Sequence, residues 1–207
     1  MAENLYYFIL ATFTLAISPG PDNIYVMTQS LSNGYKFGIA TTAGLISGCI
    51  VHTSLLAFGM SAIIAASPTI FWSIKIAGAL YLLYLAYKVW RSHEGIKLAG
   101  DANKLTYGQL FWQGVIMNLV NPKVVIFFLA FFPGFLWDLE GNTVAQFYIL
   151  GITFMITSFI VFSTIAILAG TLSNQLQKKE RLSTVFKWLQ IIVFVGIAIF
   201  ILMPDFE

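Results

Sequence analysis

The sequence predicts an all-α fold, a polytopic membrane helical bundle of six transmembrane helices. Two observations lead to this fold class. The 207 residues are 58% hydrophobic and only 10% charged, whereas soluble domains carry roughly 25% charged residues. So few charges could not cover the surface of a water-soluble protein of this size. The apolar residues also form runs that are long enough to cross a bilayer, which takes about 20 residues.

Six apolar runs follow one another along the chain, with short polar loops between them. The first run is interrupted by two prolines, and the second contains no Asp, Glu, Lys or Arg. The third ends at a polar loop, and the fourth is again broken by prolines. An acidic loop precedes the fifth run and a basic loop precedes the sixth. The expected spans cover residues 5–31, 39–66, 70–90, 110–137, 144–172 and 188–203.

The residues before the first run include no Lys or Arg. A secretory signal peptide begins with a basic segment, so we expect the first run to be retained as a span. The loops leave no room for a soluble domain. We therefore expect a single transmembrane domain over residues 1–207.

The basic residues predict the orientation of the chain, because cytoplasmic loops are enriched in Lys and Arg. The second and fourth loops and both termini contain neither residue. The odd loops are therefore expected in the cytoplasm, and both termini outside. The basic residues of the odd loops or beside them are Lys36, Lys88, Arg91, Lys97, Lys104, Lys178, Lys179, Arg181 and Lys187.

The chain also divides into two halves, residues 1–100 and 101–207, each with three spans and each opening with a proline-broken span. Three is an odd number, so the halves insert with opposite orientations. This 3+3 arrangement with broken helices 1 and 4 is typical of inverted-repeat transporters, whose sites lie between discontinuous helices.

The break in the first span is Ser18-Pro19-Gly20-Pro21-Asp22-Asn23. Proline removes a backbone donor and clashes with the preceding turn, and backbone freed within a membrane must be satisfied by protein, water or ligand. The half-helix that starts near Asp22 would direct its positive dipole end at this point. Asp22 is suited to hold an ammonium group or a proton. The alternative is that it only caps the second half-helix.

The break in the fourth span contains Asn118, Asn121, Pro122 and Lys123. A lysine at this depth is costly unless it is paired or hydrated. We expect Lys123 to face Asp22 or a shared water-filled cavity. The alternative is that its long stem carries the ammonium to an interface.

Three other features have open interpretations. Lys75 in the third span either enters a cavity or extends to the interface. His52 in the second span either relays protons or forms a hydrogen bond to a neighbouring helix. Gly44 and Gly48 have the G-x-x-x-G spacing of a close helix crossing, and we do not expect them to form a site.

Other function classes lack support in the sequence. It contains no G-x-S-x-G, H-E-x-x-H or G-x-x-x-x-G-K-[ST] motif, which are signatures of hydrolases, zinc proteases and nucleotide-binding loops. One cysteine cannot form an internal disulfide or a cysteine metal cluster, and a net charge of +2 is too small to indicate nucleic-acid binding. We expect no enzyme, cofactor or metal, and any concentrative transport would use an ion or proton gradient, with Asp22 and His52 as candidate proton carriers.

At these residues the sequence resembles the LysE/RhtB family of amino-acid exporters over residues 10–135, and its last third resembles the family only in hydropathy and length. The resemblance implies a bacterial inner-membrane protein that exports basic, neutral or hydroxy amino acids or homoserine derivatives, by proton antiport. The matching motifs are Ser18-Pro19-Gly20-Pro21-Asp22, Gly34, Gly38, Gly44, Gly48, His52, residues 75–85, Phe111-Trp112-Gln113-Gly114, Asn118, Asn121-Pro122-Lys123 and Phe132-Pro133.

Together these observations predict export of a zwitterionic substrate by alternating access. Asp22 would bind the amine or a proton, Asn23, Asn118 and Asn121 would hydrogen-bond the substrate, and Lys123 would balance Asp22 or bind the carboxylate. A small-molecule substrate and membrane lipids are the expected partners, and a homo-oligomer is left open. The candidate site residues are Pro19, Gly20, Pro21, Asp22, Asn23, His52, Lys75, Asn118, Asn121, Pro122 and Lys123.

Three rival functions are kept. One is efflux of a metal ion or another solute, although the spans lack clusters of His, Cys, Asp or Glu. Another is a non-transporting assembly or sensor component. The third is an intramembrane enzyme, for which we find no paired nucleophile and base.

Overall fold

The computed structural model describes residues 1–18, 20–91, 105–171 and 180–203. Within these ranges the side chains of residues 65, 68, 123 and 180–186 are outside the described part. The described part therefore excludes Pro19, the Lys123 side chain and several basic residues of the third and fifth loops. What the sequence predicts of these residues stays a prediction.

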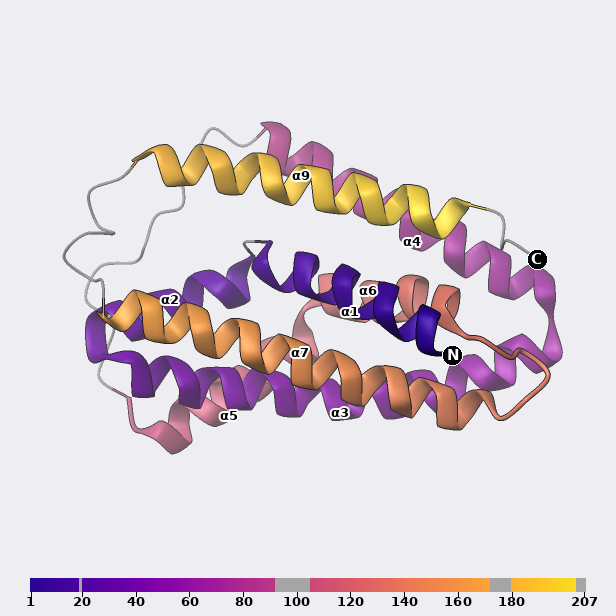
Figure 1. Ribbon diagram of the computed structural model, residues 1–207, viewed down its shortest axis with the longest axis horizontal. Coiled ribbons are helices and arrows are strands. Elements are labelled where there is room, and N and C mark those ends of the chain that lie inside the picture. Colours follow the sequence, from indigo (N-terminus) through magenta and orange to yellow (C-terminus); the bar gives the residue numbers. More distant parts are fainter. Residues whose placement is uncertain (19, 92–104, 172–179, 204–207) are drawn as a thin grey trace.

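The described part of the chain is helical and contains no strand, which confirms the all-α prediction (Figure 1). Eight elements are α-helices and one, η1, is a short 3-10 helix. They are α1 (Ala2–Ile17), α2 (Pro21–Asn33), α3 (Tyr35–Ala66), α4 (Pro68–Arg91), α5 (Tyr107–Val120), α6 (Pro122–Phe131), η1 (Phe132–Phe135), α7 (Thr143–Thr171) and α9 (Glu180–Leu202).

Three helices, α3, α4 and α7, are long and apolar enough to cross a membrane. A fourth crossing is formed if α5 and Val124–Phe135, which are bent by 55° at their break, count as one span. Helix α1 and the apolar part of α9, Lys187–Leu202, are shorter. The chain is therefore a multi-pass membrane protein with three to four candidate spans in its described part, and the count of six stays a prediction.

Helices α1 and α2 are separated at Ser18–Gly20, and α5 and α6 at Asn121. Gly20 (φ −146°, ψ 178°) and Asn121 (φ −78°, ψ 105°) both have extended backbone. Each precedes a proline, and the proline ring disfavours the helical conformation for the residue before it. Pro21 and Pro122 then begin the next helix, where a missing N–H has no consequence.

Helix α3 is the centre of the packing and lies along both α5 and α7. Helices α4 and α9 form a separate pair, and α1 and α6 lie between this pair and the layer of α3, α5 and α7 (Figure 1). A Cβ atom at Gly44 would meet the backbone of Phe111, and one at Gly114 would meet the backbone of Thr41 and Leu45. The close crossing predicted from Gly44 and Gly48 is thus confirmed, with α5 as the partner helix.

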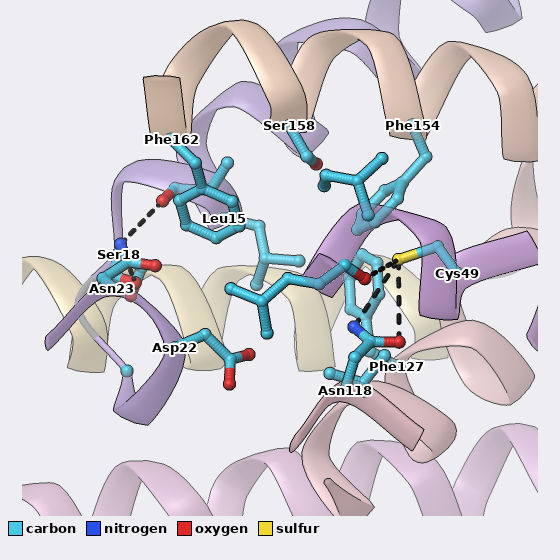
Figure 2. Close-up of a pocket in the computed structure, with 15 residues that line it drawn as sticks. Leu15, Ser18, Asp22, Asn23, Cys49, Asn118, Phe127, Phe154, Ser158 and Phe162 are labelled. Carbon is cyan, nitrogen blue, oxygen red and sulfur yellow. Dashed lines mark hydrogen bonds between the residues drawn. The ribbon is translucent and has the colours of Figure 1, made fainter. Parts of the chain in front are cut away.

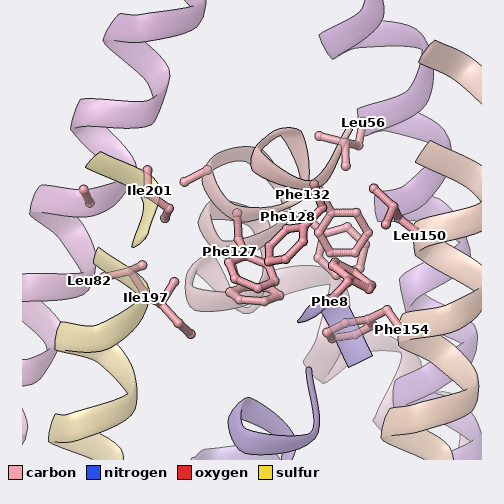
Figure 3. Close-up of a cluster of buried hydrophobic side chains, with 14 of the residues drawn as sticks. Phe8, Leu56, Leu82, Phe127, Phe128, Phe132, Leu150, Phe154, Ile197 and Ile201 are labelled. Carbon is pink, nitrogen blue, oxygen red and sulfur yellow. The ribbon is translucent and has the colours of Figure 1, made fainter. Parts of the chain in front are cut away.

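Phenylalanines fill the space where α1, α6, η1 and α7 meet (Figure 3). Phe128 stacks on Phe132 with ring centroids 4.2 Å apart, and Phe8 of α1 packs edge-on against Phe132 at 5.1 Å. Phe154 of α7 lies 5.1 Å from Phe128. Aromatic pairs at these distances are favourable beyond the apolar area that they bury, so this aromatic cluster joins the two broken segments on one side of their breaks.

Candidate functional site

The two helix breaks meet in space through Asp22 and Asn121. The side-chain amide Nδ2 of Asn121 donates to both carboxylate oxygens of Asp22, at 3.2 and 3.4 Å. Asp22 lies in the first turn of α2, but the N-cap residue is Gly20 and no side chain caps this helix. Asp22 therefore does not cap α2, and its carboxylate is directed at the second break, 99 residues away in sequence.

A cavity of about 60 Å³ lies at this junction, which is room for about two water molecules. Figure 2 shows the Asp22 carboxylate at its edge and Phe127 and Phe154 in its wall. Residues of both breaks and of α3 and α7 contribute. The lining residues are Leu15, Ala16, Ser18, Gly20, Asp22, Asn23, Leu45, Ile46, Cys49, Asn118, Val124, Phe127, Phe154, Ser158 and Phe162. One carboxylate and a few neutral polar groups thus face an otherwise apolar chamber.

Asn23 lines the cavity but also supports the first break. Its Nδ2 donates to the carbonyl oxygens of Ala16 at 2.8 Å and Ser18 at 3.3 Å. The last carbonyls of a helix have no partner within the helix, and in a membrane they need one. The amide group of Asn23 therefore stabilises the end of α1, a task that the sequence did not indicate.

Asn118 connects the second break to α3. Its side chain lies against Gly48, and its Nδ2 is 3.6 Å from Sγ of Cys49. Its backbone carbonyl accepts a hydrogen bond from Nε2 of His52 at 3.2 Å. A carbonyl can only accept, so Nε2 carries the hydrogen. The predicted alternative for His52, a hydrogen bond to a neighbouring helix, is what the structure contains.

This contact leads to a test of His52. We expect His52→Gln to export at the wild-type rate, because a glutamine amide can still donate to the Asn118 carbonyl. His52→Leu removes the donor, and we expect it to lower the stability of the detergent-solubilised protein by about 1 kcal/mol, the net value of one hydrogen bond. Efflux assays and thermal unfolding measure the two effects. Loss of efflux in His52→Gln at normal stability would instead indicate a proton carrier.

The remaining predicted site residues, Lys75, Pro21 and Pro122, do not line the cavity. Lys75 is buried, and its ammonium lies over the rings of Trp72 at 4.5 Å and Phe71 at 5.5 Å, on α4. It does not line the cavity. Pro21 and Pro122 are exposed at the first turns of their helices. The structure thus brings Gly20, Asp22, Asn23, Asn118 and Asn121 together, whereas the described contacts of Lys75 are with the rings of Trp72 and Phe71.

Two polar cavity residues outside the predicted breaks, Cys49 of α3 and Ser158 of α7, were not identified from the sequence. Both lie in uninterrupted apolar helices. A lone Cys or Ser in such a helix gives no local signal, because its side chain commonly bonds back to its own helix. Only the packing of α3 and α7 against the two breaks distinguishes them.

Comparison with known proteins identifies the family of the chain. The chain is 31% identical over 182 residues to a homoserine/homoserine lactone efflux protein of Salmonella typhimurium, which covers 88% of each chain. It is 32% identical over the same length to the protein of that name from Salmonella typhi, again covering 88% of each. No solved structure matches the chain. The profile of the family described as LysE type translocator matches residues 13–204. The chain therefore belongs to the LysE type translocators, which are membrane transporters of small molecules and not enzymes.

Proposed function

We propose that the protein exports amino acids or their close derivatives across the bacterial inner membrane, and that the cavity at the two breaks is its substrate site. The observation that carries this proposal is the Asp22 carboxylate, which reaches from one break to the other. Relatives of the protein are named for efflux of homoserine and homoserine lactone. Both molecules have an amine, so a small amine with a short polar side chain is the proposed substrate.

The groups around the cavity suit such a molecule. A carboxylate in a low-dielectric site attracts an ammonium group strongly. Gly20, the N-cap residue of α2, lines the cavity, and no side chain caps this helix. Helix N-termini favour anions. A substrate carboxylate would lie there or at Lys123. The walls Leu45, Phe127 and Phe154 would hold the methylene groups.

The helix packing supports a 3+3 inverted repeat of six spans. In such a repeat α3 corresponds to α7 and α4 to α9. These helices do pack as pairs, α3 with α7 and α4 with α9. The repeat also makes α1 correspond to α5. In agreement with this correspondence, α5 packs on α3 and α1 packs on α7. Discontinuous helices paired across such a repeat are typical of secondary transporters.

Transport would proceed by alternating access with proton antiport. A cavity of about 60 Å³ is smaller than an amino acid, so the substrate requires a wider state. The aromatic cluster of Phe8, Phe128, Phe132 and Phe154 lies toward the start of α1 and the end of α6. With the termini outside, as the basic loops predict, this cluster would close the outer side. Asp22 would carry the proton inward after releasing the amine.

A substrate screen tests the function. Cells without their own exporters are loaded with dipeptides, and the amino acids that leave are measured with and without this protein. We expect homoserine or a similarly small amino acid to leave several-fold faster when the protein is present. We also expect the rate to fall when an uncoupler collapses the proton gradient. If no amino acid or derivative leaves faster, the proposed function is wrong.

A further inference from the structure

Helix α7 contains several hydroxyl side chains that differ in what they contact. Thr153, Thr164 and Thr171 donate to the carbonyl four residues earlier, at 2.8, 2.8 and 2.7 Å. This is the usual way for a membrane helix to satisfy a hydroxyl. Ser158 lies on the same helix and is 1% exposed, yet its Oγ has no hydrogen-bond partner among the described residues. Its hydroxyl is therefore available for something that the folded chain does not supply.

The position of Ser158 indicates what that is. Ser158 lines the cavity at the two breaks. Figure 2 shows it entering from α7, on the side of the cavity opposite Asp22 in this view. Ser18, at the end of α1, also lines the cavity, is 2% exposed and has an Oγ without a partner among the described residues. Two buried hydroxyls from different helices thus adjoin one chamber.

A buried hydroxyl without a partner is unfavourable, and a bound molecule with an oxygen atom would remove this penalty. A serine hydroxyl both donates and accepts, so it can pair with a hydroxyl or with a carbonyl oxygen. It cannot form a hydrogen bond with a methyl group. Most of the other residues that line the cavity are apolar, Leu45 and Phe127 among them, which suits a short methylene chain.

We infer that Ser158, together with Ser18, determines the specificity of transport by hydrogen-bonding an oxygen on the substrate's side chain while Asp22 holds the ammonium group. This inference rests on the proposed function of the cavity. A site that hydrogen-bonds a substrate hydroxyl discriminates against an analogue without it more strongly than an apolar pocket discriminates by size. The feature of the substrate that the site recognises is the oxygen on its side chain, rather than the length of that side chain.

Homoserine and norvaline test this inference, since they differ only by a hydroxyl group in place of a methyl group. Efflux of both is measured in competition, normalised to membrane abundance. We expect the wild-type protein to prefer homoserine and Ser158→Ala to reduce this preference about tenfold, the effect of losing one hydrogen bond of about 1.4 kcal/mol. Ser18→Ala should reduce it in the same direction.

Ser163→Ala is the matched control. Ser163 is on α7 and also has a buried Oγ without a partner among the described residues, but it does not line the cavity. We expect this variant to keep the wild-type preference. A loss of preference in Ser163→Ala equal to that in Ser158→Ala would overturn the inference, because the effect would then not depend on the cavity.

Other results would also contradict the role of Ser158. They are a wild-type protein without preference for homoserine, an unchanged preference in Ser158→Ala, and an equal fall for both substrates. Failure of the proposed function is recognised separately. In that case the protein would accelerate the efflux of no amino acid. If only the assignment of the cavity is wrong, Asp22→Asn would export at the wild-type level, whatever the effect of the serine variants.

Discussion

Asp22→Asn is expected to abolish efflux while the protein remains in the membrane at normal abundance. The asparagine has nearly the same shape, and its side-chain oxygen can still accept from Nδ2 of Asn121, which donates to Asp22 at 3.2 Å. The fold at the junction should therefore persist. The charge that attracts the substrate ammonium is lost, and removing one partner of a buried charged pair costs about 2–5 kcal/mol, or at least about 30-fold in binding. Efflux of a loaded amino acid, normalised to immunoblot abundance, measures this loss.

Glu140→Gln is the control for Asp22→Asn, because it also removes one acidic charge but lies exposed in the loop before α7. We expect it to export at the wild-type rate. Lys123→Ala should show the same loss as Asp22→Asn, on the prediction that the Lys123 ammonium balances Asp22. If Asp22→Asn exports normally, the carboxylate is not part of the transport site, and the substrate binds elsewhere in the protein.

The positions of the two breaks could be predicted from the sequence because their cause is local. Proline removes one donor and constrains the residue before it, and Gly20 and Asn121 adopt extended backbone for that reason. The contact between Asp22 and Asn121 follows less directly. The sequence indicated only that a buried charge needs a partner at similar depth, and the structure supplies an amide as one partner.

The cavity wall could not be predicted in the same way. In a membrane helix the side that faces lipid and the side that faces protein are both apolar. The apolar sequence of α7 therefore does not show whether Ser158 faces lipid or the protein interior. The role of Asn23 could not be predicted either, because its amide donates to the carbonyls of Ala16 and Ser18, and this contact depends on how α2 folds back on the end of α1. Lys75 was a site candidate by depth alone, and the structure places it against Trp72 on α4.

Gly44→Ala is expected to have the largest effect on folding, because it separates α3 from α5. The added methyl group would meet the backbone of Phe111, and backbone cannot yield without moving the whole helix. Overpacking of this kind costs about 1–3 kcal/mol or more. Asn118 and Asn121 lie at the end of α5, so a displaced α5 would also disturb the contact with Asp22. We expect low membrane abundance, a lower unfolding temperature in detergent, and weaker efflux per molecule.

Gly59→Ala separates this packing effect from the intrinsic preference of the helix. Gly59 lies on the same helix, and a Cβ atom there would meet nothing within 4 Å. Helix propensity alone favours alanine over glycine by about 1 kcal/mol at either position, so it predicts that both variants are stabilised equally. The close crossing predicts opposite signs, with Gly59→Ala neutral or stabilised and Gly44→Ala destabilised. Equal unfolding temperatures for the two variants would mean that α3 and α5 do not approach closely at Gly44, and the cavity that depends on their approach would then lack its support.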